Sequence, residues 1–570
     1  MVKKTLKNTW PEVLLGCLLV FHLTSNILWS NLNQTPPPWD PANHIIISAQ
    51  LKDCFSSFLD TGLIRCLTVS PFYPPLVHSL VSLAFLLFGT KLAVAQLASN
   101  IFFALMVGAV YIWAKEFYKS KSIALLTASV TSFLPVLFDA GRFLWLEIPL
   151  VAIIYFAMYL LLKSNSFSDK KFTVAAFVAL GLGIMSKWYV AVSLFIPFAL
   201  TFLQSLKKNQ YKKTLATVSV GIFISALISA PWFIANKTGF LYYASFYTKP
   251  DFSEPSVLFS LENITWYLKM FASYQIGMWF FAIFLGILGY YLANKNIKNK
   301  GFSLSFLLFG YIVFTALGNK DFRYTYYLLP VIASIIAISV TEMHKKYRTV
   351  SEILSYTILA TLLIQYFTLS YRNYLEIEYK KSIRLPIFEW APIINLSDYP
   401  VQSFGTDYWP NDKIVGDIME LANGKKVKLQ VIVEYPQINA TNLKMELLFK
   451  EAKNVAINED FPFETAESLK TRANIVSFLK EKDYILVPEN EASPDYYIFE
   501  DLLDRVQNVM LSENNDFSEV VKIYELPTEA VYKTLLNARL PQQEDGERYE
   551  YCESNSCNRV FLYRVNHFQE

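Results

Sequence analysis

Two carboxylates stand at the ends of apolar segments, where an acid is costly and usually has a function or a partner. Asp40 follows the first apolar segment, between the proline run at 36–38 and Pro41. Because Pro41 suits the first turn of a helix, Asp40 is placed either as a helix N-cap or as a reactive acid, with His44 one turn further on the same face. Glu147 begins a later apolar segment. Either carboxylate could accept a proton from an incoming hydroxyl or amine.

Four cations stand close to other apolar segments: Arg142, Lys187, Lys320 and Arg323. Lys187 interrupts an apolar run from residue 172 to 206, which is too long for one membrane crossing, so it lies at a turn or snorkels. Lys320 and Arg323 share one short turn with a single acid. A phosphate would compensate this charge, since the planar guanidinium matches its oxygens. Arg142 could join this set or form a structural ion pair with Glu147.

Aromatic residues accompany the charged ones. Tyr73 precedes Pro74 and Pro75, and Tyr324 follows Arg323 directly. An aromatic belt at the membrane interface explains such residues locally. Together with the cations they also suit a lipid-linked substrate, with His44, Tyr73 and Tyr324 as substrate-binding candidates. The combination indicates group transfer from a lipid-linked phosphate.

The elements that must position these residues are membrane helices. Charged residues make up 17% of the 570 residues, against about 25% in a soluble domain, and the deficit lies before residue 371. Apolar runs long enough to cross a bilayer recur there. We expect eleven spans, at residues 12–30, 92–113, 122–140, 146–162, 172–187, 189–205, 214–235, 274–293, 302–317, 325–342 and 352–370. The first could also be a signal peptide, but no small-residue cleavage site follows it, so we interpret it as a retained helix.

Basic loops predict the topology, because cytoplasmic loops are enriched in Lys and Arg. Six basic segments occur: residues 3–7, 115–121, 163–171, 207–213, 295–300 and 345–348. Two expected spans separate each neighbouring pair, so all six can share the cytoplasmic side. The apolar stretch 74–88 would break this parity and is therefore expected at the outer interface. The outer loops 31–91 and 236–273 and everything after residue 370 are then extracytoplasmic.

The C-terminal part, residues 371–570, resembles a soluble α/β layer domain. Strands are expected at 427–433, 484–487, 520–526 and 560–565, the last two paired, with helices at 443–453 and 475–482. The domain shows no phosphate loop, zinc spacing or nucleophile elbow, so it could be a lid, an acceptor platform or a structural cap. Cys54 and Cys66, and Cys552 and Cys557, could form disulfides on the outer side or be small buried residues.

The order of the motifs resembles the GT-C membrane glycosyltransferases of the protein-O-mannosyltransferase and aminoarabinose lipid A transferase type. The resemblance covers residues 1–370 and, more loosely, the tail. The motifs that carry it are Asp40, Tyr73 to Leu76 before Leu87-Phe88-Gly89, Glu147-Ile148-Pro149, Lys187, Pro231-Trp232, and Arg323-Tyr324 before Pro330.

The resemblance implies an inverting transfer of a sugar from a polyprenyl-phosphate donor to a lipid, glycan or protein acceptor. By position, Asp40 is similar to the catalytic base, Glu147 to the second-loop acid, and Lys187 and Arg323 to donor-phosphate ligands. Pro41, Tyr73 and Glu147 depart from residues that some members carry there, which leaves the acceptor open. A divalent metal is also left open, and no metal ligands are singled out.

We therefore expect a multi-pass glycosyltransferase of the plasma or inner membrane, with a 1–370 transmembrane domain and membrane lipids around it. The net charge of +3 argues against a nucleic-acid partner. The alternative is a transporter or flippase for a lipid-linked sugar, but such proteins place ionisable residues near the bilayer midplane. An inactive scaffold is a third option, against which the presence of Asp40, Lys187 and Arg323 argues.

Overall fold

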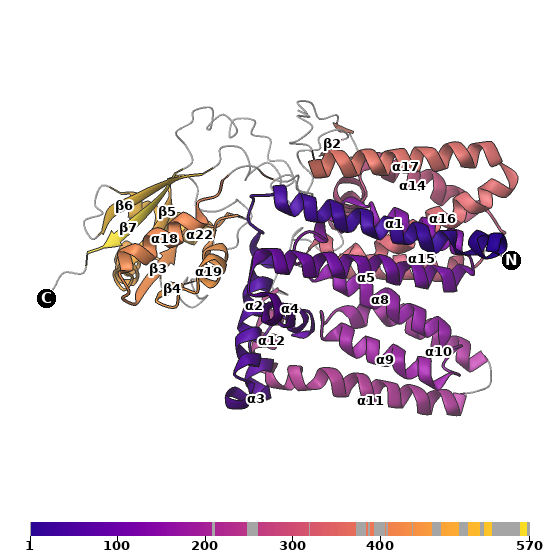
Figure 1. Cartoon of the computed structure of the whole chain (residues 1–570), viewed down its shortest axis with the longest axis horizontal. Helices are drawn as coiled ribbons and strands as arrows, with labels where there is room; N and C mark the ends of the chain where they lie inside the picture. Colours follow the sequence, from indigo (N-terminus) through magenta and orange to yellow (C-terminus); the bar gives the residue numbers. More distant parts are fainter. Residues whose placement is uncertain are drawn as a thin grey trace. The chain divides into compact units, whose positions relative to one another are not determined.

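The computed structural model consists of two compact units (Figure 1). The first contains Met1–Ser30, Gln50–Asn395 and Val401–Ser403, and the second contains Asn31–Ala49, Leu396–Pro400 and Phe404–Glu570. The structure describes residues 2–207, 211–247, 260–318, 320–371, 384–385, 388–392, 405, 408–435, 437–458, 469–489, 500–512, 518–526 and 559–566.

The first unit is a bundle of long apolar helices that lie side by side (Figure 1). These are α1 (Val2–Leu32), α5 (Leu92–Tyr118), α8 (Glu147–Lys163), α9 (Lys170–Ile184), α10 (Val190–Lys207), α11 (Tyr211–Ala235), α14 (Met278–Ala293), α15 (Lys300–Ala316), α16 (Leu329–Lys346) and α17 (Arg348–Tyr371). Among the described residues, six helices are long and apolar enough to cross a membrane, and a bent pair would add a seventh. All eleven expected segments are helical, so the polytopic helical class is confirmed, whereas the number of crossings stays a prediction.

Three expected spans are less regular than the sequence suggests. The segment 122–140 divides into α6 (Lys121–Ser132) and α7 (Pro135–Ala140), because Pro135 cannot continue a helix but suits the start of a new one. The segment 274–293 overlaps a π-helical turn, η2 (Phe271–Gln275). The helical segment Leu261–Gln275 and the helix α14 that follows it meet at an angle of 119°. The helix α16 is preceded by a 3₁₀ turn, η3 (Phe322–Leu328).

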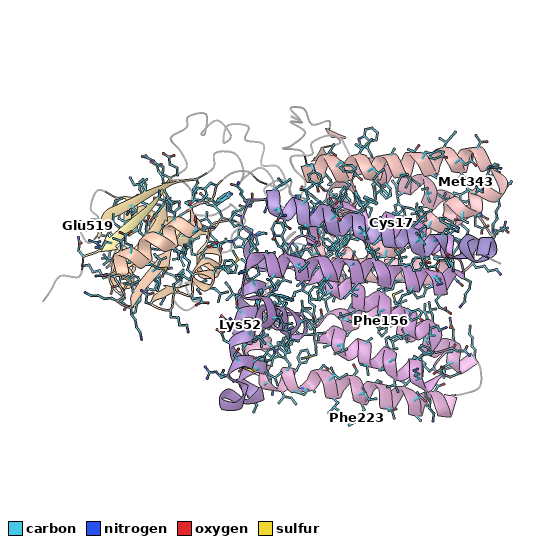
Figure 2. All side chains as sticks on the ribbon, viewed as in Figure 1. Cys17, Lys52, Phe156, Phe223, Met343 and Glu519 are labelled. Carbon is cyan, nitrogen blue, oxygen red and sulfur yellow. A yellow bond between two sulfur atoms is a disulfide. The ribbon has the colours of Figure 1, made fainter. Side chains whose placement is uncertain are left out.

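The bundle has a buried centre and an apolar outer surface. In the span Phe322–Lys346, which contains α16, 89% of the most apolar 18-residue stretch is buried. In the span Thr9–Leu32 the corresponding share is 17%. Large apolar side chains such as Phe156 on α8 and Phe223 on α11 are exposed (Figure 2). So extensive an apolar surface is unfavourable in water but favourable in contact with the lipid chains of a membrane.

Ion pairs join three of the basic segments at one end of the bundle. Glu12 of α1 pairs with Lys115 at 3.2 Å and with Lys121 at 2.9 Å, and Glu116 pairs with Lys163 at 3.9 Å. The N-terminal segment and the two loops that follow α5 and α8 therefore share one end. This arrangement agrees with the parity of the basic loops. The start of α8, and with it Glu147, lies toward the opposite end.

The predicted orientation can be tested by cysteine labelling of intact cells with an impermeant maleimide. The background carries Cys17→Ser, Cys552→Ser and Cys557→Ser and keeps the other two cysteines. We expect Lys413→Cys to react and Lys119→Cys to react only after the membrane is opened, because both side chains are exposed and the predicted topology puts them on opposite sides of the membrane. The reverse pattern would invert the orientation of the whole chain.

Short helices gather at the bundle end away from the basic loops (Figure 1). They are α3 (Phe58–Leu67), α4 (Leu76–Phe88) and α12 (Lys237–Tyr247). A further short helix is α13 (Leu261–Met270). The 13 residues of α4 span only about 20 Å, too little to cross the hydrocarbon core, as expected for an interfacial helix. Cys54 and Cys66 form a disulfide, while Cys552 and Cys557 lie outside the described residues.

The second unit contains a five-stranded mixed sheet in the order β4-β3-β5-β7-β6. The strands are β3 (Val427–Val431), β4 (Val455–Asn458), β5 (Tyr484–Pro488), β6 (Ser518–Glu525) and β7 (Arg559–Val565). Strands β3, β4 and β5 are parallel, and β7 is antiparallel to both β5 and β6. The expected pairing of the last two strands is confirmed.

Helices cover both faces of this sheet. The side chains of α18 (Asn411–Ala422) and α19 (Ala440–Phe449) pack in one core with Leu429 and Leu486. Those of α21 (Arg472–Lys480) and α22 (Glu500–Leu511) pack in a second core with Ile485. The two cores follow from the alternation of side chains along β5, which makes the domain a three-layer α/β unit. The two short strands β1 (Arg384–Leu385) and β2 (Phe388–Pro392) pair separately in the first unit.

Candidate active site

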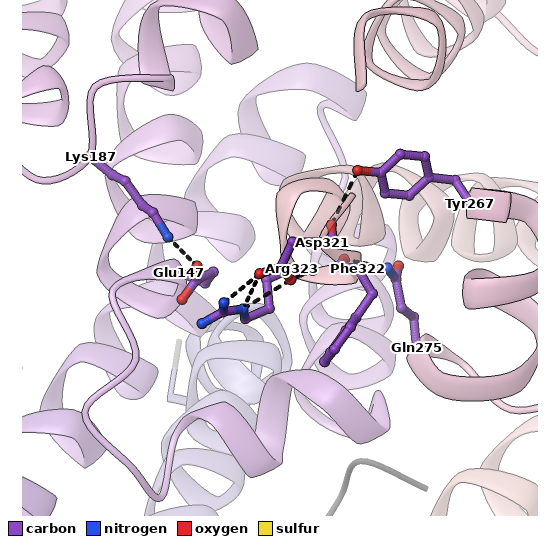
Figure 3. Close-up of polar contacts among 7 residues, drawn as sticks. All are labelled: Glu147, Lys187, Tyr267, Gln275, Asp321, Phe322 and Arg323. Atoms are coloured by element: carbon purple, nitrogen blue, oxygen red, sulfur yellow. Dashed lines mark hydrogen bonds and ion pairs between the residues drawn. The ribbon is translucent and has the colours of Figure 1, made fainter. Parts of the chain in front are cut away.

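The first unit brings Glu147 and Lys187 into a salt bridge (Figure 3). Glu147 is 1% exposed and begins α8, where the positive end of the helix dipole favours a carboxylate. Lys187 stands between α9 and α10, at the turn that the sequence predicted, and its side chain is 12% exposed. Removing one partner of such a buried pair costs about 3–5 kcal/mol, because the other charge stays unpaired.

The second ion pair joins Asp321 and Arg323 (Figure 3). Asp321 also accepts a 2.8 Å hydrogen bond from the backbone N–H of Arg323, which caps η3. The guanidinium of Arg323 lies 4.6 Å from the ring centroid of Trp145, two residues before Glu147. Arg323 and Glu147, which are far apart in the sequence, are therefore parts of one site.

Two side chains that the sequence did not single out hold this turn in place. Gln275, fully buried at the end of η2, donates to Phe322 O at 2.6 Å and to Thr325 Oγ1 at 2.8 Å. The hydroxyl of Tyr267 donates to Asp321 O at 3.2 Å (Figure 3). A π-helical turn often marks a functional site, but no sequence signal predicts one reliably.

Tyr189 lies between the two ion pairs. Its ring packs edge-to-face on Tyr324, with ring centroids 5.6 Å apart, and the ammonium of Lys187 lies 5.3 Å from its centroid. Within the described residues, Tyr189 OH, Ser186 Oγ and Glu147 Oε2 are buried with no hydrogen-bond partner. Because buried polar atoms are usually paired, these three atoms can serve as hydrogen-bonding groups for a polar ligand.

The loop that carries Tyr73 is fixed against the Lys187 turn. The N–H of Leu76 donates to Met185 O at 2.9 Å, and the indole of the buried Trp232 donates to Ser70 O at 3.3 Å. These contacts explain why a Pro-Pro-Leu element and a distant Pro-Trp pair occur together. They place the loop beside the turn that presents the salt-bridged lysine.

Lys320 makes contacts different from those expected of a phosphate ligand. Its ammonium donates to three carbonyls at the end of α15, those of Phe314, Thr315 and Leu317, and uses all three of its protons. Burial lowers the pKa of Lys320 to about 8, so the group is still charged near neutral pH. A cation at the C-terminus of a helix stabilises it. The phosphate site proposed below therefore omits Lys320.

Replacing Lys320 with methionine separates the two roles. If Lys320 is a helix cap, Lys320→Met should lower the melting temperature, because charged hydrogen bonds contribute about 1.5–3 kcal/mol, while donor affinity stays at the wild-type value. Differential scanning fluorimetry and a lipid-phosphate binding assay measure the two quantities. A stable variant with weakened donor binding would restore the phosphate role.

Arg142 is fully buried in the first unit and does not pair with Glu147. Its guanidinium donates to Asn26 Oδ1 at 3.3 Å and to Ser370. Three aromatic rings surround the guanidinium. Their centroids lie 5.0 Å (Trp29), 4.9 Å (Phe138) and 5.7 Å (Tyr366) from Arg142 Cζ. The ion pair considered from the sequence is therefore replaced by the Glu147–Lys187 pair. Its contacts give Arg142 a packing role, so the proposed phosphate site omits it as well.

Asp40 and His44 belong to the second unit, at the start of α2 (Trp39–Ser56). Since this helix begins at Trp39, Asp40 lies in its first turn and is not its N-cap. Ala42 N–H donates to Pro38 O at 3.1 Å, which makes Pro38 the first acceptor of the helix. His44 is 2% exposed. Asp40 therefore stands on a regular helix that begins directly after the proline run.

The described residues contain no group of three or more His, Cys, Asp or Glu side chains with the spacing of a metal site. The described part of the chain thus gives no structural basis for naming metal ligands. The requirement for a metal ion is left to experiment.

Apolar helices that carry buried ion pairs at one end, followed in the chain by an α/β domain, are the architecture of an integral membrane protein. Residues 73–234 match the family described as dolichyl-phosphate-mannose-protein mannosyltransferase. A comparison with curated protein sequences finds no significant match.

Solved structures show the same fold over nearly the whole chain. ArnT from Cupriavidus metallidurans in the apo state aligns with a TM-score of 0.59 and 12% identity over 94% of this chain and 100% of its own. The same protein bound to undecaprenyl phosphate aligns with a TM-score of 0.55 and 14% identity, over 94% of this chain and 100% of its own. The arabinofuranosyltransferase AftD from Mycobacteria aligns with a TM-score of 0.53 and 12% identity, over 98% of this chain and 40% of its own. The GT-C resemblance predicted from the order of the motifs is confirmed at the level of the fold.

Proposed function

We propose that the protein is an inverting glycosyltransferase that moves a sugar from a polyprenyl phosphate to a lipid, glycan or protein acceptor on the non-cytoplasmic face. The observation that carries this proposal is the pair of cations, Lys187 and Arg323, held beside three unpartnered buried polar atoms. A similar fold has been solved with undecaprenyl phosphate bound, which supports a lipid phosphate as the donor.

In the proposed reaction the acceptor's hydroxyl or amine attacks the anomeric carbon as the bond from that carbon to the phosphate oxygen breaks. The electron pair of the broken bond leaves on the phosphate, whose added charge Lys187 and Arg323 stabilise. The proton of the attacking group goes to the Asp40 carboxylate. Attack opposite to the leaving group inverts the anomeric configuration.

Each proposed phosphate ligand is already neutralised by a carboxylate, Lys187 by Glu147 and Arg323 by Asp321. A bound phosphate must therefore share or displace these partners. The carboxylates hold the cations in place, and they limit how strongly the spent lipid phosphate is retained. Release of that product needs such a limit if the enzyme is to turn over.

The position of the charges favours an enzyme over a transporter. Glu147 begins α8, Lys187 lies between α9 and α10, and Arg323 precedes α16. All three stand at helix ends, whereas transporters bind substrates near the midplane on interrupted helices.

The experiment is sugar transfer by the purified full chain in liposomes containing a panel of polyprenyl-phosphate sugars. Mass spectrometry of glycolipids and glycoproteins from cells with and without the gene selects the acceptors to add. We expect cleavage of the sugar–phosphate bond and a new glycoside of inverted configuration. Movement of intact donor between leaflets without cleavage would support the transporter instead.

A further inference from the structure

The segment that carries Asp40 is packed within the C-terminal unit. Residues 31–49 form one compact unit with the α/β domain, although hundreds of residues separate them in the chain. Gln34 N–H donates to Gly405 O at 2.7 Å, and Gly405 N–H donates to Asn33 Oδ1 at 2.9 Å. The entry to the segment is thereby attached to the chain just before α18.

Two side chains of the α/β domain fix the residues directly before Asp40. The indole N–H of Trp39 donates to Glu434 Oε1 at 2.8 Å. The amide of Asn442 donates to Pro37 O at 2.8 Å. Pro38, which lies between the two anchored residues, restricts the backbone, so the two anchors set the direction in which the chain enters α2. Asp40 is thus held one residue beyond an anchored indole.

One anchor lies in the connection between β3 and α19, and the other lies in the first turn of α19. Glu434 lies three residues after the end of β3, at the carboxyl edge of the parallel strands, where α/β sheets commonly bind other groups. Asn442 is fully buried in the first turn of α19, whose start is capped by Asn439. One anchor is therefore held by a helix, and the other lies close to the end of a strand.

Burial fixes the other side of α2. Ala42 is 0% and Ile45 is 1% exposed, and the side chain of Asp40 is partly exposed. The first turn of the helix therefore cannot rotate without exposing apolar surface. Asp40 keeps access to a reactant while its backbone is held on two sides.

We infer that Glu434 and Asn442 are positioning residues for Asp40, so that the α/β domain sets the location of the general base. The inference rests on the proposed function, because it takes Asp40 as the proton acceptor. It gives the domain a role in catalysis beyond that of a lid, an acceptor platform or a structural cap. A catalytic group misplaced by about 1 Å can lose about a hundredfold in rate.

The test uses the full chain with Glu434→Ala, Glu434→Gln and Asn442→Asp. Glu434→Ala removes the acceptor for the indole, whereas Glu434→Gln retains an oxygen there. Asn442→Asp keeps the shape but cannot donate to Pro37 O. Lys453→Ala, an exposed change in the same domain, is the control.

We expect kcat to fall about tenfold to a hundredfold in Glu434→Ala and Asn442→Asp, with donor affinity and melting temperature unchanged. Glu434→Gln and the control should stay within about twofold of wild type, on the same argument. Hydrogen exchange of residues 39–46 should rise in the two impaired variants alone. Such a pattern separates positioning from a loss of folding.

Wild-type kcat in variants whose residues 39–46 exchange faster would overturn the positioning role. Unchanged exchange in Glu434→Ala and Asn442→Asp would overturn it too, because the anchors would not hold the segment. If the unaltered protein transfers no sugar from any donor, the proposed function fails. The exchange data then test only whether Glu434 and Asn442 anchor residues 39–46. The two failures are therefore distinguishable.

Discussion

Asp40→Asn should reduce sugar transfer by about a hundredfold to ten-thousandfold, the contribution that a positioned general base typically makes. The amide has nearly the shape of the carboxylate but cannot accept the proton of the attacking group. Asp40 lies in the first turn of α2, where loss of its charge costs about 0.3–1 kcal/mol of interaction with the helix dipole. The variant should therefore fold and bind donor normally.

The matched control is Asp53→Asn, which removes an exposed carboxylate from the same helix. Initial rates of transfer in liposomes, protein abundance in membranes and melting temperature are measured for both variants. Near-normal transfer by Asp40→Asn would remove Asp40 as the base and leave it a structural residue of the helix. A fall in both variants would point to the helix and not to the chemistry.

Hydrophobic runs and basic loops sufficed to predict the helical framework. A span needs about twenty apolar residues whatever its neighbours are, so each expected segment coincides with helical structure. Local patterns also predicted β3, β5, β6 and β7. The break at Pro135 and the bend after Gln275 depart from the expectation, because packing decides whether a proline or a π-turn interrupts a span.

Pairings between distant residues could not be predicted from spacing. Along the chain, Arg142 was the candidate partner of Glu147, but packing brings Lys187 to it while Arg142 lies among aromatic rings. Similarly, the pattern of residues after position 371 contains nothing that specifies the Trp39–Glu434 hydrogen bond. Single residues such as Tyr189 were missed because one buried tyrosine among 35 carries no signal of its own.

Loss of Arg323 should weaken binding of the polyprenyl-phosphate donor by roughly tenfold to a hundredfold or more. A charged hydrogen bond to phosphate in a partly dry site contributes about 1.5–3 kcal/mol, which corresponds to that range of affinity. Arg323→Ala also frees Asp321, whose negative charge would then repel the phosphate. Arg323→Gln with Asp321→Asn removes both charges and isolates the cation's own contribution.

Lys187 needs a paired change because its partner is buried. Lys187→Ala alone leaves Glu147 unpaired, and a fall in donor affinity could then reflect damage to the fold. Lys187→Gln with Glu147→Gln removes both charges and keeps two groups able to hydrogen bond. A loss of affinity in this double variant then comes from removal of the ion pair and not from an unpaired buried carboxylate.

Donor affinity is measured with undecaprenyl phosphate and the purified protein in nanodiscs. The control is Lys298→Ala, which removes an exposed cation from a basic loop and should leave affinity unchanged. If both charge-neutral double variants bind the lipid phosphate as the wild type does, the two ion pairs are structural and the phosphate site lies elsewhere. If both weaken binding and the control does not, the cations act on the phosphate directly. The carboxylates that pair with them are then the groups with which the donor phosphate must compete.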